Sequence, residues 1–330
     1  MYLADVPPFA QGQDAVLDAF KKSVWFTRAW TLQELLAPKY VIFCTSSWEI
    51  IGHRCHRQQI NDEFSISGLD GVAQYSFRPC YGVLRAAHLH SFGPNLEESI
   101  SATTGIPTIF LGSVKVYKAS VAQRLSWVAH RKTTRTEDIA YCLLGLLRVS
   151  MPLLYGEGTD AWLRLQQEII RRSSDESIFA WIEPSGRIDQ PSYGMLAPSP
   201  ECFASSGTVV TRHLHFGDIA DDGLESYTFT NKGIVLSARA HQWSQGRETI
   251  HIIRLACRYR TLDGELHGCN LAIKYGYNGQ YRRTMAWDLG AYLEHHLLGA
   301  HLEHALNKSE EIAERMPEKA NFTVQALAID

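Results

Sequence analysis

The stretch Trp25-Phe-Thr-Arg-Ala-Trp-Thr-Leu-Gln-Glu-Leu-Leu-Ala-Pro38 decides the fold of the first part of the chain. It predicts a helix over Thr27–Leu36 that the closing proline ends, because proline cannot donate the backbone hydrogen bond that continues a helix. A strand-like run at Tyr2–Val6 precedes this helix, and another at Tyr40–Phe43 follows it. Strand, helix and strand in this order predict a βαβ piece of a parallel sheet over residues 1–44.

Three helices are predicted between residues 97 and 183. The first begins after Ser120, the second at the capping-box pair Thr134 and Glu137, and the third after Gly156-Glu157-Gly158. The charged side chains around the start of the second predicted helix have two interpretations. Their arginines bind an anion, or the group forms a helix cap with ion pairs. The members of this cluster are Arg131, Arg135, Glu137 and Asp138.

The last third of the chain has the alternating and β-branched composition of an antiparallel β-rich module. Runs such as Gly233–Ala238 and Thr249–Tyr259 predict strands, and Asp263-Gly264 and Asn278-Gly279 predict tight hairpin turns. The fold class is therefore α+β: a partial parallel sheet with helices, then the β module. The predicted divisions are a first domain piece 1–53, an insertion 54–96, a helical continuation 97–183, a linker 184–193, the β module 194–288 and a helical tail 289–330.

Composition excludes several functional classes. The net charge is −3 and no basic block is long enough to follow a phosphate backbone, so no nucleic-acid partner is predicted. The apolar runs are shorter than the roughly 20 residues of a membrane-spanning helix. The seven cysteines include no C-x-x-C pair, which favours reduced thiols in the cytoplasm and no metal site.

Three blocks of sequence resemble the second half of the fungal heterokaryon-incompatibility (HET) domain and the region behind it. The first is the Trp25–Pro38 stretch with Val41-Ile-Phe43 and Trp48-x-x-x-Gly52. The second runs from Ser126-Trp127 to Met151-Pro-Leu-Leu-Tyr-Gly-Glu-Gly158, and the third is Arg164–Glu168 with Asp175–Trp181. Residues 194–233 are similar to a module often found behind this domain. The resemblance implies non-self recognition and programmed cell death through other proteins of the incompatibility pathway, with a homo-oligomer as an option. It also implies that the first strands of the domain precede Tyr2 and are absent from this sequence.

HET domains are similar to TIR domains, and this resemblance suggests a chemistry for one acid. Trp30-Thr-Leu-Gln-Glu-Leu35 resembles the stretch that carries the catalytic Glu of NAD-cleaving TIR domains, so Glu34 is the candidate catalytic residue. A carboxylate near the ribose could stabilise the oxocarbenium-like state of nicotinamide release. Trp30, one turn earlier, and Arg28 are the candidate NAD-binding residues, with NAD as substrate and no resident cofactor.

Other interpretations of the same residues remain open. Glu34 could be a surface acid paired with Arg28, since a Glu in a helix is most often solvated or ion-paired. The chain could then be a non-enzymatic interaction module that docks partners through Trp-rich and Arg-rich surfaces. It could also be an inert, truncated copy of a family member.

Overall fold

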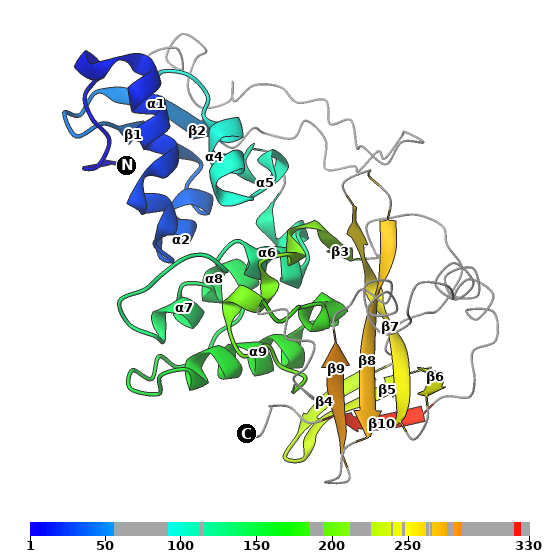
Figure 1. Ribbon diagram of the computed structural model, residues 1–330. Coiled ribbons are helices and arrows are strands. Elements are labelled where there is room, and N and C mark those ends of the chain that lie inside the picture. The colour runs from blue at the N-terminus through cyan, green and yellow to red at the C-terminus, as the bar shows by residue number, and fades with distance from the viewer. Residues whose placement is uncertain are drawn as a thin grey trace. The chain divides into compact units, whose positions relative to one another are not determined.

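The computed structural model divides the chain into two compact units (Figure 1). The first consists of residues 1–119 and 131–134, and the second of residues 120–130 and 135–330. The described residues are 1–55, 92–112, 115–184, 194–211, 226–238, 240–245, 248–261, 264, 266–275, 280–285 and 320–324. The predicted α+β class is confirmed: helices dominate the first half, and a mostly antiparallel sheet dominates the second.

The first unit is built from short helices around a two-stranded sheet. Its elements are η1 (Phe9–Gln11), α1 (Gln13–Lys22), η2 (Val24–Thr27), α2 (Thr31–Leu36), β1 (Tyr40–Cys44), β2 (Ile50–Cys55), α4 (Glu97–Thr104), α5 (Thr108–Gly112) and η4 (Val116–Lys118). Its core contains an aromatic cluster in which the ring centroid of Phe20 lies 5.2 Å from those of Phe26 and Phe43. These rings are almost fully buried and join α1, η2 and β1.

The predicted helix over Thr27–Leu36 is wrong in its first part. The chain forms the 3-10 helix η2 up to Thr27, becomes extended at Arg28 (φ −86°, ψ 138°), and starts α2 only at Thr31. The reason is a long-range strand-like contact: the N–H of Lys132 donates to the Thr27 carbonyl (2.7 Å), and the N–H of Ala29 donates to the Lys132 carbonyl (3.0 Å). These bonds occupy backbone groups that a continuous helix would use.

Among the described residues of this unit, parallel pairing is limited to isolated bridges, of Tyr2 with Cys44, Arg28 with Lys132 and His53 with Asn95. The predicted strand Tyr40–Phe43 is confirmed as β1, but the run Tyr2–Val6 pairs with it only at Tyr2, in parallel with Cys44. A turn, in which the N–H of Val6 donates to the carbonyl of Leu3, ends the pairing. The sheet neighbour of β1 is β2, which runs antiparallel to it. The parallel βαβ expectation is corrected accordingly.

The ends of the predicted insertion 54–96 are ordered parts of the unit. Strand β2 continues to Cys55, and His53 bridges Asn95, with the Leu96 N–H donating to the His53 carbonyl at 2.9 Å. A Cβ on Gly52 would overlap the Pro94 carbonyl, so this close approach requires glycine. Residues 56–91 lie outside the described part of the chain.

The second unit combines helices and the main sheet. Its elements are α6 (Val121–Ser126), α7 (Asp138–Tyr141), α8 (Leu144–Leu147), α9 (Asp160–Arg172), η5 (Glu176–Phe179), η6 (Pro200–Phe203), η7 (Ser206–Thr208), β3 (Val209–Thr211), β4 (Ser226–Thr230), β5 (Gly233–Ala238), β6 (Ala240–Gln245), β7 (Glu248–Arg260), β8 (Leu266–Tyr275), β9 (Tyr281–Met285) and β10 (Ala320–Val324). The strand order is β3-β7-β8-β9-β10-β5-β4, with β6 also paired to β7. All these pairs are antiparallel except β9 with β10.

Helices and strands of this unit are joined by side-chain hydrogen bonds to backbone. Ser120 is the helix N-cap, as predicted, and forms a capping box with Gln123; its hydroxyl also donates to the carbonyl of Val209 on β3 (2.7 Å). Glu176 of η5 accepts from the N–H of Ala256 on β7 (2.7 Å). Residues that the sequence assigned to separate helical and β-rich regions therefore form one packed body. The predicted linker 184–193 lies outside the described residues except for its first residue.

Three finer expectations require correction. Residues 138–147 form two short helices, α7 and α8, in place of one. Glu137 makes no capping box with Thr134, because its carboxylate binds backbone groups near residue 157. In the predicted helical tail 289–330, the described residues 320–324 form strand β10, which pairs with β5 and whose buried Phe322 contacts the rings of His251 and Tyr281. The rest of that tail lies outside the described residues.

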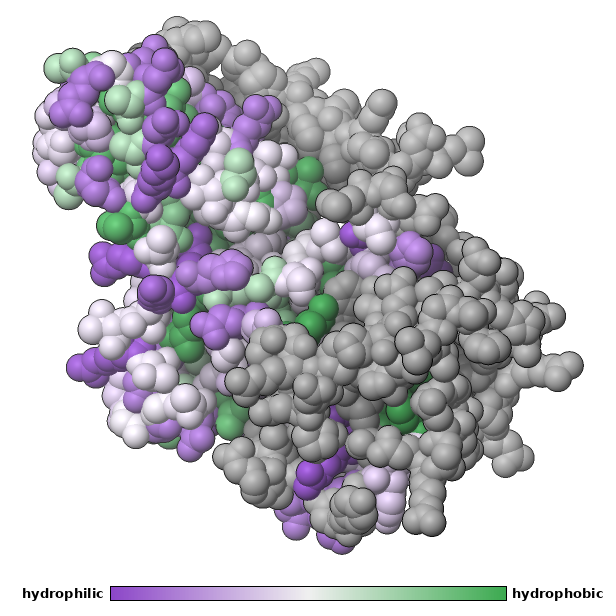
Figure 2. All heavy atoms as spheres, viewed as in Figure 1, coloured by the Kyte–Doolittle hydropathy of each residue, from purple (hydrophilic) through white to green (hydrophobic). Residues whose placement is uncertain are grey.

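The visible surface offers no obvious apolar face over the described residues. In Figure 2, hydrophilic and hydrophobic residues are interspersed, and the green areas on the described part are small and separated. No helix among the described residues has both the length and the apolar character needed to cross a bilayer.

Candidate functional site

The three predicted site residues lie close together in sequence on the exposed side of α2 and the segment before it. Arg28, Trp30 and Glu34 are all exposed, with Trp30 at 38%. The Glu34 N–H donates to the Trp30 carbonyl (3.5 Å), so the indole and the carboxylate are one helical turn apart, as expected. No ion pair joins Arg28 and Glu34, and the Glu34 carboxylate has no hydrogen bond to another described residue. The interpretation that Glu34 forms a surface ion pair with Arg28 is therefore wrong.

The start of α2 is fixed by a buried arginine. Thr31 Oγ1 lies 2.6 Å from the carbonyl oxygen of Trp25 and 2.7 Å from that of Arg28. Arg131 Nη1 donates to the Arg28 carbonyl and to Thr31 Oγ1, each at 3.0 Å. Because Arg131 makes these hydrogen bonds, it stabilises the start of α2. The anion-binding interpretation of the charged cluster is then left with Arg135 of its two arginines.

The end of α2 is fixed by a second buried arginine, from β2. Arg54 is fully buried and donates to the carbonyl of Pro38 at 2.9 Å and to that of Leu35. These carbonyls lie at the helix C-terminus, where unpaired acceptors and the negative end of the helix dipole favour a cation. Burial lowers the pKa of Arg54 to about 10, so the guanidinium remains charged at neutral pH. Two arginines thus hold the short helix that displays Trp30 and Glu34.

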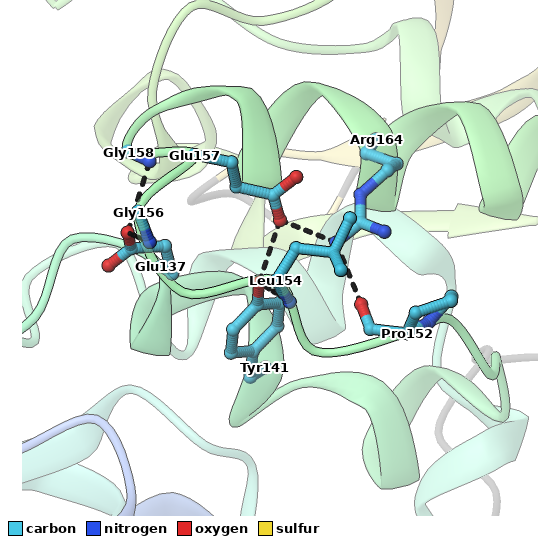
Figure 3. Close-up of polar contacts among 8 residues, drawn as sticks. All are labelled: Glu137, Tyr141, Pro152, Leu154, Gly156, Glu157, Gly158 and Arg164. Carbon is cyan, nitrogen blue, oxygen red and sulfur yellow. Dashed lines mark hydrogen bonds and ion pairs between the residues drawn. The ribbon is translucent and has the colours of Figure 1, made fainter.

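A second polar cluster, not predicted from the sequence, surrounds the turn Gly156-Glu157-Gly158 (Figure 3). One carboxylate oxygen of Glu137 accepts from the N–H of Gly156 (2.7 Å) and from that of Gly158 (3.1 Å). Both glycines have positive φ, 103° and 59°, a conformation that other residues rarely adopt. Hydrogen bonds from the backbone N–H groups of Glu137 itself and of the two glycines lower the pKa of Glu137.

The other half of this cluster is formed by Tyr141, Glu157 and Arg164. The Tyr141 hydroxyl donates to Glu157 (2.7 Å) and accepts from the Leu154 N–H (2.8 Å), while Arg164 pairs with Glu157 and donates to the Pro152 carbonyl (2.8 Å). Burial and the hydrogen bond to Glu157 raise the pKa of Tyr141. The bonds hold residues 152–158 through three side chains, Glu137 at the N-cap of α7, Tyr141 of α7 and Arg164 of α9. We call residues 152–158 with these three side chains the clasp.

The sequence signal for the clasp was the presence of charged residues in the second and third blocks that resemble HET proteins. Glu137 and Arg164 are 27 residues apart in sequence, and both reach residues 152–158 only through a chain reversal that periodicity does not encode. The prediction that Gly156-Glu157-Gly158 forms a turn into a helix is confirmed. Among the described residues, no group of three or more His, Cys, Asp or Glu side chains is arranged to hold a metal ion.

Comparison with known proteins gives one informative match. Over 173 residues, 51% of this chain, the sequence is 34% identical to the vegetative incompatibility protein HET-E-1 of Podospora anserina. The chain is similar to an incompatibility protein. The match spans only 10% of the length of that relative, so the chain corresponds to a small part of it. No family model matches the chain, and no solved structure matches it; the TIR-like architecture therefore stays a prediction.

Replacing Glu137 by Gln is expected to lower the free energy of unfolding in a pH-dependent way. The native carboxylate has a pKa below its ordinary value of 4.5, so it stabilises the fold above that pH, and the stabilisation is lost as the pH falls through the lowered pKa. Urea unfolding should show the full difference between the two proteins near pH 7 and a difference that shrinks as the pH falls below 4.5. Glu98→Gln, which removes an exposed acid of α4, is the control. A difference that stays constant with pH contradicts the role of the Glu137 charge.

Proposed function

We propose that the chain acts in vegetative incompatibility, in non-self recognition that leads to cell death. The observation that carries this proposal is the 34% identity with HET-E-1 over half of the chain. Because the match covers a small part of that protein, the proposal concerns the role and not the whole activity of the relative.

We further propose that the chain hydrolyses the bond between nicotinamide and ribose in NAD, with Glu34 stabilising the transition state while nicotinamide leaves and water adds to the ribose carbon. The carboxylate is exposed on α2 with no competing partner among the described residues, and the Trp30 indole is exposed one turn away. A carboxylate in this place could stabilise positive charge on the ribose, while the indole stacks on a planar ring. Arg28, also exposed, could pair with a phosphate group of the dinucleotide. Arg54 and Arg131 support the proposal because they hold α2 in one position.

The second candidate is a non-enzymatic interaction module. The observation that favours it is the exposure of Trp30, at 38%, next to exposed charged groups. Tryptophan and arginine are enriched among the residues that dominate protein interfaces. In this case α2 docks a protein of the incompatibility pathway, and Glu34 contributes polar contacts at the rim of the interface.

The Glu34→Gln variant distinguishes the two candidates. Purified chain is incubated with NAD, and nicotinamide release is followed by chromatography. If Glu34 is catalytic, the variant should release nicotinamide at least about 100-fold more slowly, the usual loss when one transition-state-stabilising group is removed. Glu98→Gln is the matched control because it also neutralises an exposed helical acid, and its rate should equal that of the parent chain. No release by the parent chain, or equal rates for parent and Glu34→Gln, rejects the enzymatic proposal.

Expression in a filamentous fungus tests the incompatibility role itself. The chain should lower the viability of cells in which it is expressed or of cells that fuse. Loss of this effect in Glu34→Gln supports catalysis, whereas loss in Trp30→Ser with full effect in Glu34→Gln supports the interaction module. An unchanged viability with the parent chain rejects the role.

A further inference from the structure

The loop held by the clasp exposes three consecutive apolar side chains. Leu153 and Leu154 are each 52% exposed, and Tyr155 is 50% exposed. Isolated exposed apolar residues are common, but a run of three on one loop is unusual unless it makes contact with something. Tyr155 also contacts Asp138 and Tyr141, but the described part of the chain leaves both leucine side chains half-exposed.

This loop is fixed in place although its side chains face solvent. Its backbone is bonded on both sides and in the middle: Arg164 binds the Pro152 carbonyl, the Tyr141 hydroxyl binds the Leu154 N–H, and Glu137 binds the Gly156 N–H. Figure 3 shows these contacts converging on the loop from α7 and α9. A preorganised loop loses little conformational entropy when it binds, which favours its use as a contact surface.

Two charged groups beside the loop make no hydrogen bond or ion pair with another described residue. The guanidinium of Arg135 lies over the Tyr155 ring at 4.7 Å, and no hydrogen bond or ion pair joins it to another described residue. Asp160, the first residue of α9, is exposed, and its carboxylate likewise makes neither contact. The neighbouring acids differ: Asp138 accepts from the Tyr155 hydroxyl (3.0 Å), and Glu157 pairs with Arg164.

We propose that this surface, made of Leu153, Leu154, Tyr155, Arg135 and Asp160, joins two copies of the chain about a two-fold axis. Beside the apolar loop, this surface carries a cation, Arg135 over the Tyr155 ring, and an anion, Asp160, whose backbone N–H donates to the Glu157 carbonyl. Neither charge forms an ion pair among the described residues, so two copies of the surface offer each other opposite charges. In a two-fold contact, the loops of the two copies pack together, and Arg135 of each copy pairs with Asp160 of the other. The proposal is independent of whether Glu34 cleaves NAD.

An anionic membrane is a less suitable occupant. Around the loop, two cationic side chains stand against four anionic ones: Arg135 and Arg164 against Glu137, Asp138, Glu157 and Asp160. Recognition of anionic lipid requires clusters of several basic residues without such acids. A second copy satisfies both unpaired charges at once, whereas a lipid surface satisfies only the arginine.

Sedimentation velocity of the purified full chain tests the contact. The parent chain should show a dimer whose fraction rises with concentration up to about 100 μM, the range of a modest interface. The double variant Leu153→Ser, Leu154→Ser should weaken dimerisation at least tenfold, because it removes the apolar centre. Circular dichroism should show the same thermal unfolding for both proteins, since these side chains are exposed.

Charge reversal gives the sharper measurement. Arg135→Asp and Asp160→Arg alone should each weaken dimerisation about tenfold, because each homodimer places like charges opposite one another. An equimolar mixture of the two variants should regain the dimerisation of the parent chain, since the heterodimer restores both opposite-charge pairs. A third variant, Arg171→Asp, reverses an exposed charge on the last turn of α9 and should leave the parent dimerisation unchanged.

Three outcomes overturn the proposal. A parent chain that is monomeric at all concentrations has no such contact, and its binding to phosphatidylserine vesicles would then assign the loop to a membrane. A dimer that survives the double serine substitution uses another surface. Variants that lose dimerisation singly but do not recover it when mixed contradict the two-fold arrangement of Arg135 and Asp160.

Discussion

Replacing Arg283 by Ala is expected to lower the free energy of unfolding by about 3–5 kcal/mol, the usual range for breaking a buried charged contact. Arg283, in the middle of β9, is 1% exposed and donates to the carbonyls of Phe179 and Trp181. Its guanidinium lies 3.9 Å from the centre of the Trp181 ring. The residue thus joins a strand of the main sheet to the segment after η5.

The size of this effect follows from what the substitution leaves behind. Burial lowers the pKa of Arg283 to about 9, so the side chain is still charged at neutral pH and depends on the two carbonyls and the indole for compensation. Alanine removes that charge, but it leaves two buried carbonyl oxygens without these donors, each costing about 1–3 kcal/mol. It also leaves a cavity beside Trp181, to which the surrounding residues adjust only in part.

Urea unfolding followed by tryptophan fluorescence and circular dichroism measures the loss. Arg283→Lys should lose less than Arg283→Ala, because an ammonium keeps the charge but cannot donate to both carbonyls in the fork geometry of a guanidinium. Arg171→Ala, whose side chain is 58% exposed, is the control and should change stability by less than about 1 kcal/mol. A loss below about 1 kcal/mol for Arg283→Ala contradicts the account.

Elements with a local signature were predictable from the sequence. The Ser120 N-cap of α6, the amphipathic helix α9 and strands β5 and β7 were all expected, because each is specified by residues within one or two turns or by a period of two. The 3-10 helix η2 and the delayed start of α2 were not. Their cause is a pairing with Lys132, about a hundred residues away, which no local pattern records.

In the candidate site, too, the local features were predictable from the sequence and the long-range contacts were not. The i,i+4 spacing placed Trp30 and Glu34 on one face of a helix, and the structure confirms that arrangement. The arginines that hold this helix were unpredictable, since Arg54 and Arg131 are recognised only by the backbone carbonyls they reach. A lone arginine in sequence is normally exposed, and its burial depends on tertiary partners. The catalytic assignment of Glu34 comes from a resemblance and stays a prediction.

Replacing Arg54 by Met is expected to lower the free energy of unfolding by about 2–3 kcal/mol. Methionine fills a similar volume, so the main loss is the pair of hydrogen bonds to the carbonyls of Leu35 and Pro38 at the end of α2. The loss should be smaller than for Arg283→Ala, because Arg54 Nε is buried without a hydrogen-bond partner and methionine relieves that desolvation.

The same substitution should loosen the helix that carries the candidate site. With its last carbonyls unpaired, α2 frays from its C-terminal end, toward Glu34. Hydrogen exchange of the α2 backbone amides should therefore accelerate in Arg54→Met more than exchange in α9, which belongs to the other compact unit. Arg28→Met, which changes an exposed arginine before the same helix, should leave both stability and exchange close to those of the parent chain. Equal acceleration in α2 and α9 would show a global loss of stability, and it would reject a specific role of Arg54 in holding α2.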